Sequence, residues 1–108
     1  MKYKEGVIRK GLHPAMRRVE KIVDEIWPMF GVEAVMTSGL DGDHSQWSWH
    51  HYGCAADFRT RDLIPPHVHM VAAALRDRLG VPYQVVIEDD HIHVEFDPEA
   101  YGMKWTTS

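Results

Sequence analysis

Two short stretches of the sequence concentrate side chains that could bind a metal ion. The first, SWHHYGCAAD, contains His50 and Asp57, and the second, EDDHIHVE, contains His91 and His93 among acidic residues. Imidazole and carboxylate are ligands that zinc accepts, and three protein ligands with one open position are typical of a catalytic zinc site. A lone histidine on a strand is more often a hydrogen-bonded structural residue. The prediction of a zinc site therefore depends on the combination of the two stretches.

The first stretch ends in a strand pattern that sets the direction of Asp57. Residues 54–59 alternate, so Asp57 is expected on the face opposite to Cys54, Ala56 and Phe58. The Asp57 side chain would thus project from the face of the sheet away from the core, where it could bind a metal ion. Cys54, the single cysteine of the chain, is expected to pack in the core rather than to bind metal.

The second stretch is predicted to form a hairpin from strands 83–88 and 91–96. A two-residue turn between them would set Glu88 opposite His91 and bring a carboxylate and the imidazoles of His91 and His93 onto one face. The core-facing positions would then be Val85, Ile87, Ile92 and Val94.

The rest of the chain is predicted to supply two helices and a further strand. Apolar residues at spacings of three and four indicate a helix from Pro14 to Gly31 and a second that ends at Gly80, with Asp62 as its cap. A strand at 32–38 and an arm at 1–12 complete the chain. The expected fold is α+β: one domain over residues 1–108, with a small, mostly antiparallel sheet and two helices on one face.

The two metal-binding stretches resemble the signatures of the zinc D-alanyl-D-alanine carboxypeptidases. Their superfamily also includes D-Ala-D-Ala dipeptidases, phage L-alanyl-D-glutamate endolysins and the hedgehog signalling domain, so the resemblance implies a fold of that kind. The second stretch is similar to a His-x-His or acid-x-x-His segment on a central strand. The positions that match the first signature are Ser48, His50, Gly53, Ala55 and Asp57.

This resemblance implies roles for individual residues. Zinc would be bound by His50, Asp57 and His93, and His91 would hydrogen-bond the substrate or stabilise an oxyanion. The acid three residues before the last ligand, Asp90, would be the general base.

The hairpin register nominates a different base, Glu88, because its side chain would share a face with the imidazoles. Either carboxylate could take a proton from water beside the metal and pass it to the leaving amine. Asp90 and Glu88 both remain candidates on the sequence.

One feature of the family is missing from the sequence. An Arg usually follows the Ser-Gly after the first strand and helps to bind a substrate carboxylate or the oxyanion, but here no Arg occurs until Arg59. His44, Arg59 and Arg61 could substitute. With Ser48 of the first signature, His44 and Arg59 are the expected substrate-binding residues.

Composition excludes several classes of function. The chain has 108 residues, 44% of them hydrophobic, and a formal net charge of -4, which argues against a nucleic-acid partner. No apolar run approaches the ~20 residues that span a bilayer, so no membrane insertion is expected. The N-terminus has no apolar signal region. We expect a monomer made in the cytoplasm without a signal peptide, of phage or prophage origin, that acts on the cell wall after release.

Two functions from different classes are compatible with these residues. The first is a zinc metallopeptidase of the D,D-carboxypeptidase or endolysin type, which hydrolyses peptide bonds of bacterial peptidoglycan with metal-activated water. The second is a non-catalytic, zinc-stabilised binding module of the same fold. The acid pair Glu88 and Asp90 favours the enzyme, whereas the missing Arg favours the module.

Overall fold

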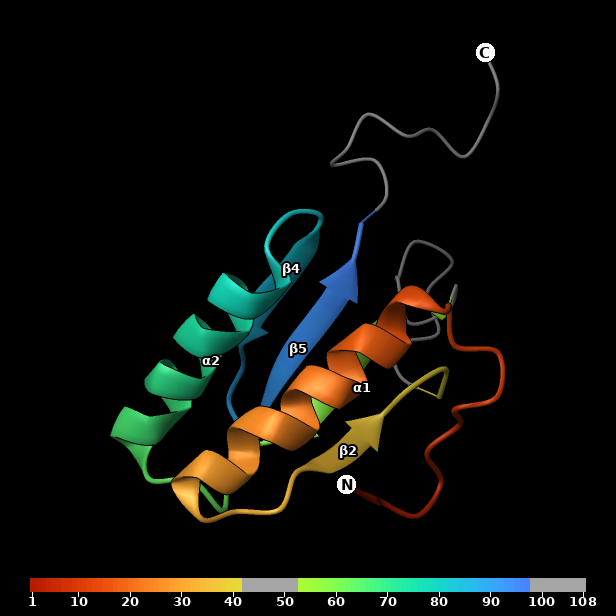
Figure 1. Cartoon of the computed structure of the whole chain (residues 1–108). Helices are drawn as coiled ribbons and strands as arrows, with labels where there is room; N and C mark the ends of the chain where they lie inside the picture. Colours follow the sequence, from red (N-terminus) through yellow and green to blue (C-terminus); the bar gives the residue numbers. More distant parts are fainter. Residues whose placement is uncertain (42–52, 98–108) are drawn as a thin grey trace.

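Five strands form one mixed sheet, and helices α1 and α2 cover one of its faces (Figure 1), within residues 1–41 and 53–97, the part of the chain that the computed structural model describes. The sequence correctly predicts this α+β class and the two helices on one face. In chain order the elements are β1 (Lys2–Tyr3), α1 (Ala15–Ile26), the 3₁₀ helix η1 (Trp27–Phe30), β2 (Val35–Ser38), β3 (Ala55–Arg59), α2 (Pro65–Leu79), β4 (Tyr83–Ile87) and β5 (His91–Phe96).

The strand order places side by side β3 and β5, which carry the described parts of the two stretches predicted to bind metal. The order is β1-β2-β3-β5-β4, in which β1 runs parallel to β2 and the other neighbours pair antiparallel. Asp57 on β3 is directly opposite His93 on β5. The hairpin of β4 and β5 has the predicted register, since the Glu88 N–H donates to the His91 carbonyl at 2.8 Å and Val86 is opposite His93.

Helix α1 forms where the apolar stripe predicts it. Its buried face packs on the sheet, and the His13 ring Nδ1 accepts the Ala15 N–H at 3.0 Å near the first turn. Pro28 cannot donate to an α-helical ladder, and the chain tightens into η1 before Gly31, with φ 75°, ends it. The buried residues of α1 are Met16, Val19, Ile22, Val23 and Ile26.

Helix α2 begins differently from the prediction. Ile64 occupies the cap position without a side-chain hydrogen bond, and the predicted cap, Asp62, instead binds the Arg59 guanidinium at 2.9 Å and 3.0 Å. Pro65 and Pro66, at the first helical positions, have no N–H groups. The first turn therefore has fewer unpaired donors that a capping side chain would need to satisfy.

The core lies between the helices and the sheet, as the strand alternation predicts. Ala56, Phe58, Ile92 and Val94 are fully buried, and Phe58 lies 6.0 Å from Trp27 between ring centroids. Truncating a buried aromatic residue typically costs about 3–5 kcal/mol, so this layer holds β3 and β5 firmly together. Cys54 is also fully buried, as predicted for a packing residue.

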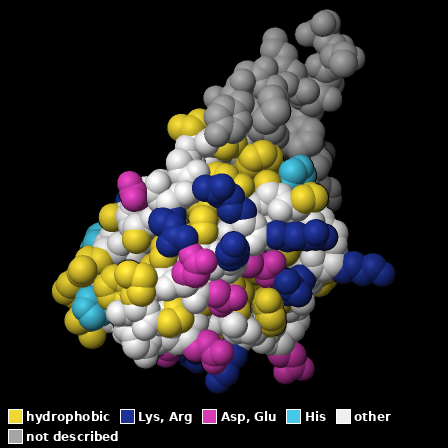
Figure 2. All heavy atoms as spheres, in the orientation of Figure 1, with side chains coloured by type: hydrophobic (Ala, Val, Ile, Leu, Met, Phe, Trp, Pro, Cys, Tyr) yellow, Lys and Arg dark blue, Asp and Glu magenta, His cyan; other side chains and the backbone are white. Residues whose placement is uncertain are grey.

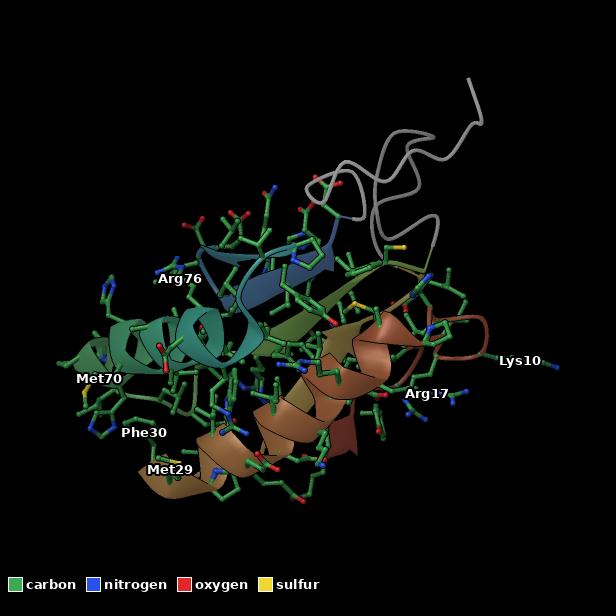
Figure 3. All side chains as sticks on the ribbon, turned by 45° about the horizontal axis from the view of Figure 1, so that its top comes forward. Lys10, Arg17, Met29, Phe30, Met70 and Arg76 are labelled. Atoms are coloured by element: carbon green, nitrogen blue, oxygen red, sulfur yellow. The ribbon has the colours of Figure 1, made fainter. Side chains whose placement is uncertain are left out.

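Apolar side chains also gather at one end of the helix layer. Met29 and Phe30 lie beside Met70 of α2 (Figure 3), and the Phe30 ring is 4.9 Å from the ring of His67. On the face seen in Figure 2, hydrophobic side chains cluster at this end, and acidic and basic groups are interspersed across the middle of the face. Met29 is 72% exposed.

The N-terminal segment is the main departure from the predicted elements. It was expected to lie against the domain, but residues Lys2–Tyr3 join the sheet as β1. Strand β2 is shorter than the predicted 32–38. Tyr101 and Trp105, expected to fold back onto the domain, lie outside the described residues.

Candidate metal centre

The face of the sheet away from the helices carries the polar residues of both stretches. Strand alternation puts Asp57 of β3 on this open face, together with His91, His93 and Glu95 of β5. Their neighbours in the sequence, such as Ile92 and Val94, are fully buried on the helix side. The same alternation that builds the core therefore assembles the site.

Asp57, His93 and Glu95 form a hydrogen-bonded group at the centre of this face. The Asp57 Oδ1 is 2.8 Å from His93 Nδ1, and the Glu95 Oε1 is 3.0 Å from His93 Nε2. All three side chains are largely buried, with 13%, 18% and 15% of Asp57, His93 and Glu95 exposed. Both ring nitrogens of His93 thus face a carboxylate.

The carboxylates determine the protonation of His93. Burial alone would lower the pKa of this imidazole, but the hydrogen bonds and negative charges of Asp57 and Glu95 outweigh burial and raise the pKa to about 9. At neutral pH and without metal, His93 is therefore an imidazolium that donates from Nδ1 to Asp57 and from Nε2 to Glu95.

The same arrangement fits a metal ion. With its Nε2–H held by Glu95, His93 would direct Nδ1 toward Asp57 once the Nδ1 proton is lost, which is how a carboxylate commonly orients a metal-binding imidazole. Tetrahedral zinc bonds of about 2.0–2.2 Å put two ligand atoms roughly 3.3 Å apart. The 2.8 Å between Asp57 Oδ1 and His93 Nδ1 is close to that separation.

The third predicted ligand, His50, lies outside the described residues. Within residues 1–41 and 53–97, no group of three or more His, Cys, Asp or Glu side chains is arranged to hold a metal ion. The structure therefore brings together Asp57 and His93, two of the three predicted ligands. The predicted substrate-binding residues His44 and Ser48 also lie outside the described part.

A second acid–imidazole pair adjoins the first. The His91 Nδ1 is 2.7 Å from Asp90 Oδ1, and its Nε2 is 3.7 Å from Asp57 Oδ1. The hydrogen bond from His91 and the charge of that ring lower the pKa of the exposed Asp90 carboxyl, which is therefore ionised at neutral pH. Carboxylates and imidazoles thus alternate across the open face.

Glu88 has a different environment from Asp90. Its backbone is paired with His91 as the register predicts, but its side chain is exposed and makes no hydrogen bond or ion pair within the described part of the chain. The carboxylate that contacts the His91 ring is that of Asp90 rather than that of Glu88.

A cavity of about 420 Å³ opens beside these pairs. Asp90 lies on its wall, whereas Glu88 does not, and Arg59 contributes to the wall while its guanidinium is bound to Asp62. The described lining residues are Lys4, Thr37, Ser38, Asp57, Arg59, Arg61, Asp90 and His91.

Two residues of this region were missed by the sequence analysis. Glu95 was given no role, although its spacing of two from His93 places it on the same face and is a usable signal. Lys4 was not considered, because nothing local in the sequence indicates that β1 pairs with β2.

Comparisons with protein families and with curated proteins found no match to the chain. None of the helices in the described residues is both long enough and apolar enough to cross a membrane.

Proposed function

We propose that the chain is a zinc metallopeptidase that hydrolyses peptide bonds of bacterial peptidoglycan, of the D,D-carboxypeptidase or endolysin type, with a fold of the hedgehog and D,D-peptidase kind. The observation that carries the proposal is the pairing of Asp57 with His93 at 2.8 Å on adjacent central strands, with Glu95 behind the imidazole. Asp57 also lines a cavity large enough for a short peptide segment.

The proposed zinc ligands are His50, Asp57 and His93. Bound there, zinc would activate a water molecule and polarise the scissile carbonyl. Glu95 keeps the Nε2 proton of His93 in place, so that Nδ1 is the atom available to the metal. The antiparallel pairing of β3 with β5 sets Asp57 directly opposite His93 and so fixes the distance between these two ligands.

Asp90 is the better candidate for the general base. It lies on the cavity wall, and its carboxylate is ionised at neutral pH, as a general base must be, although the contact with His91 lowers its pKa and so makes it a weaker base. One oxygen is engaged by His91, which leaves the other to take the proton. With Nδ1 held by Asp90, a protonated His91 ring would donate from Nε2 to negative charge that develops on the substrate.

The test combines metal analysis with digestion of purified peptidoglycan. The zinc-loaded protein should release new amino termini or D-alanine, detected by mass spectrometry, and a chelator should stop the release. Asp90→Asn should retain zinc and lower the rate by about 10²–10⁴-fold. Glu88→Gln is the matched control and should be mild.

Two results would contradict parts of this proposal. If Asp90→Asn and Glu88→Gln both cleave normally, neither acid is the base. If the zinc-loaded wild type binds peptidoglycan but never cleaves it, the chain is instead a zinc-stabilised binding module.

A further inference from the structure

We infer that a second cavity, beside α1, binds a phosphate group through the side chains of Lys10 and Arg17. The expected ligand is a dianionic phosphate group, carried either by inorganic phosphate in solution or by the head of a lipid. This inference does not depend on the proposed peptidase function, because the described lining of this cavity shares no residue with that of the cavity beside Asp57.

The cavity lies between a turn of the N-terminal segment and the first part of α1. It has a volume of about 510 Å³ and is lined by residues 9–12 of this turn and, from α1, by Arg17 among others. The turn is closed by the Leu12 N–H, which donates to the Arg9 carbonyl at 3.0 Å. Lys10 therefore lies at the tip of a turn whose backbone is held in place.

One cation of the cavity is already neutralised. Arg9 binds the Glu20 carboxylate through Nε at 2.9 Å and Nη2 at 3.1 Å, and its guanidinium lies 4.5 Å from the centre of the Tyr3 ring. The Glu20 side chain is only 14% exposed. This ion pair holds the turn against α1, and it engages the one acid of the described lining, so that acid does not compete with a ligand.

The remaining charge of the lining belongs to Lys10 and Arg17. Both side chains are exposed, and neither forms a hydrogen bond or an ion pair within the described part of the chain. Figure 3 shows both projecting outward at the end of the molecule where α1 begins, so neither has to leave a partner in order to contact an anion. Because Arg9 and Glu20 cancel, the described lining has a surplus of two positive charges in a chain whose formal net charge is -4.

This surplus favours a compact dianion. A phosphate group carries about 1.5–2 negative charges near neutral pH and several acceptor oxygens, so it can accept from the planar guanidinium of Arg17 and also pair with the Lys10 ammonium. A carboxylate has a single charge and would leave half of the surplus uncompensated. A long polyanion would be repelled by the acidic groups that give the chain its negative net charge. A single phosphate group therefore suits the cavity best.

The test titrates inorganic phosphate into isotopically labelled, metal-free protein and follows the amide resonances by NMR. A chelator removes zinc, so that phosphate does not bind to the metal instead. Phosphate should shift the resonances of residues 9–12 and Arg17 with a Kd on the order of 1 mM, as expected for two exposed cations. Acetate should bind severalfold more weakly, and sodium chloride at equal ionic strength should give no saturable shift.

Matched charge removals locate the effect. Lys10→Met and Arg17→Gln should each weaken phosphate binding severalfold, whereas Arg17→Lys should retain most of it. Lys21→Met and Arg18→Gln remove the same charges at exposed positions of α1 that do not line the cavity, and each should leave the Kd unchanged. All four positions are exposed, so the variants should fold like wild type.

Vesicle sedimentation then identifies the source of the phosphate. Vesicles of phosphatidylcholine that contain phosphatidic acid present the same dianionic group on a lipid, whereas pure phosphatidylcholine does not. Sedimentation with the first vesicles alone, lost in Lys10→Met and Arg17→Gln, would assign the ligand to a lipid head. Phosphate binding without sedimentation would assign it to a soluble phosphate.

Two results would overturn the inference. The first is that phosphate shifts the resonances of residues 9–12 no more than sodium chloride does. The second is that the two cavity variants weaken phosphate binding no more than Lys21→Met and Arg18→Gln do. Neither result would bear on the peptidase function, which is measured separately on the zinc-loaded protein.

Discussion

His93 is the residue on which the other side chains of the open face depend. It is in contact with one carboxylate at each ring nitrogen, at 2.8 Å for Asp57 and 3.0 Å for Glu95. Without metal these contacts stabilise the imidazolium, whereas a metal ion would need the deprotonated Nδ1. Zinc, if bound as proposed, would therefore compete with the proton for Nδ1, and Glu95 would accept from Nε2 in both states.

Replacing Glu95 should weaken metal binding without removing a ligand. Glu95→Gln keeps the size of the side chain but exchanges an anionic acceptor for a neutral amide, so the orientation and basicity of His93 suffer. We expect the zinc affinity, measured by competition with a chromophoric chelator, to fall about 10–100-fold. Glu88→Gln is the matched control on the same hairpin, and an equal loss in both variants would contradict the role given to Glu95.

The metal-free protein should lose stability as the pH rises from 6.5 to about 9. The pKa of His93 is raised from 6.5 to about 9 on folding, so the native state binds this proton more tightly than the unfolded state. The contribution is complete below pH 6.5 and is lost as the pH passes 9, with an upper limit of about 3 kcal/mol.

Urea unfolding in the presence of a chelator measures this dependence. His93→Gln is the reference, because it removes the titrating group and leaves the other histidines. The difference in free energy of unfolding between wild type and the variant should shrink with pH over this range. A difference that stays constant would show that His93 is not charged in the folded protein.

Among the elements, the strands that bear the proposed ligands were predictable and the connections between distant elements were not. Alternation over β3 and the short turn of the β4–β5 hairpin are local, so the sequence correctly indicates which side chains share the open face. The pairing of β1 with β2 joins residues more than thirty positions apart and has no local signal. The prediction that Asp62 caps α2 was wrong, because the Asp62 carboxylate forms an ion pair with Arg59 instead.

Gly53, which precedes β3, should be sensitive to substitution. Its φ is 74°, and an added Cβ would lie 2.5 Å from the Gly11 carbonyl oxygen. Gly53→Ala should therefore lower the free energy of unfolding by more than the ~1 kcal/mol expected for a positive φ alone.

Gly31 offers a closely matched comparison for this measurement. Its φ is 75°, but a Cβ there would meet no atom within 4 Å. Gly31→Ala should therefore show the conformational effect without the clash. Chemical denaturation of both variants tests the difference, and equal losses would mean that the segment around Gly11 moves away at no cost.

At the scale of the whole molecule, the two faces of the sheet carry different kinds of side chain. The helix side buries the core and leaves mixed charges and an apolar end in solvent (Figure 2), while the opposite side carries the alternating acids and imidazoles. This division follows from strand parity, so much of it could be predicted from the sequence. The cavity wall could not, because Lys4 and Arg61 arrive from segments far apart in the chain.

Methionine oxidation should reveal the same two-layer packing. Met29 and Met70 are 72% and 54% exposed, whereas Met16 and Met36 are fully buried. Dilute hydrogen peroxide should convert the first two to sulfoxides well before the others, as read by peptide mass spectrometry. Similar oxidation rates at all four positions would contradict the packing of α1 on the sheet.

The sequence separation of Asp57 and His93 has a kinetic consequence. The two residues are 36 positions apart, and both α2 and β4 lie between them. Their approach requires the closure of a long loop, whereas the β4–β5 hairpin is local and can form early. Bound zinc should therefore slow unfolding and leave the refolding rate nearly unchanged, which stopped-flow measurements with and without zinc can test. In this protein the metal would bind after the chain has folded and would then slow its unfolding.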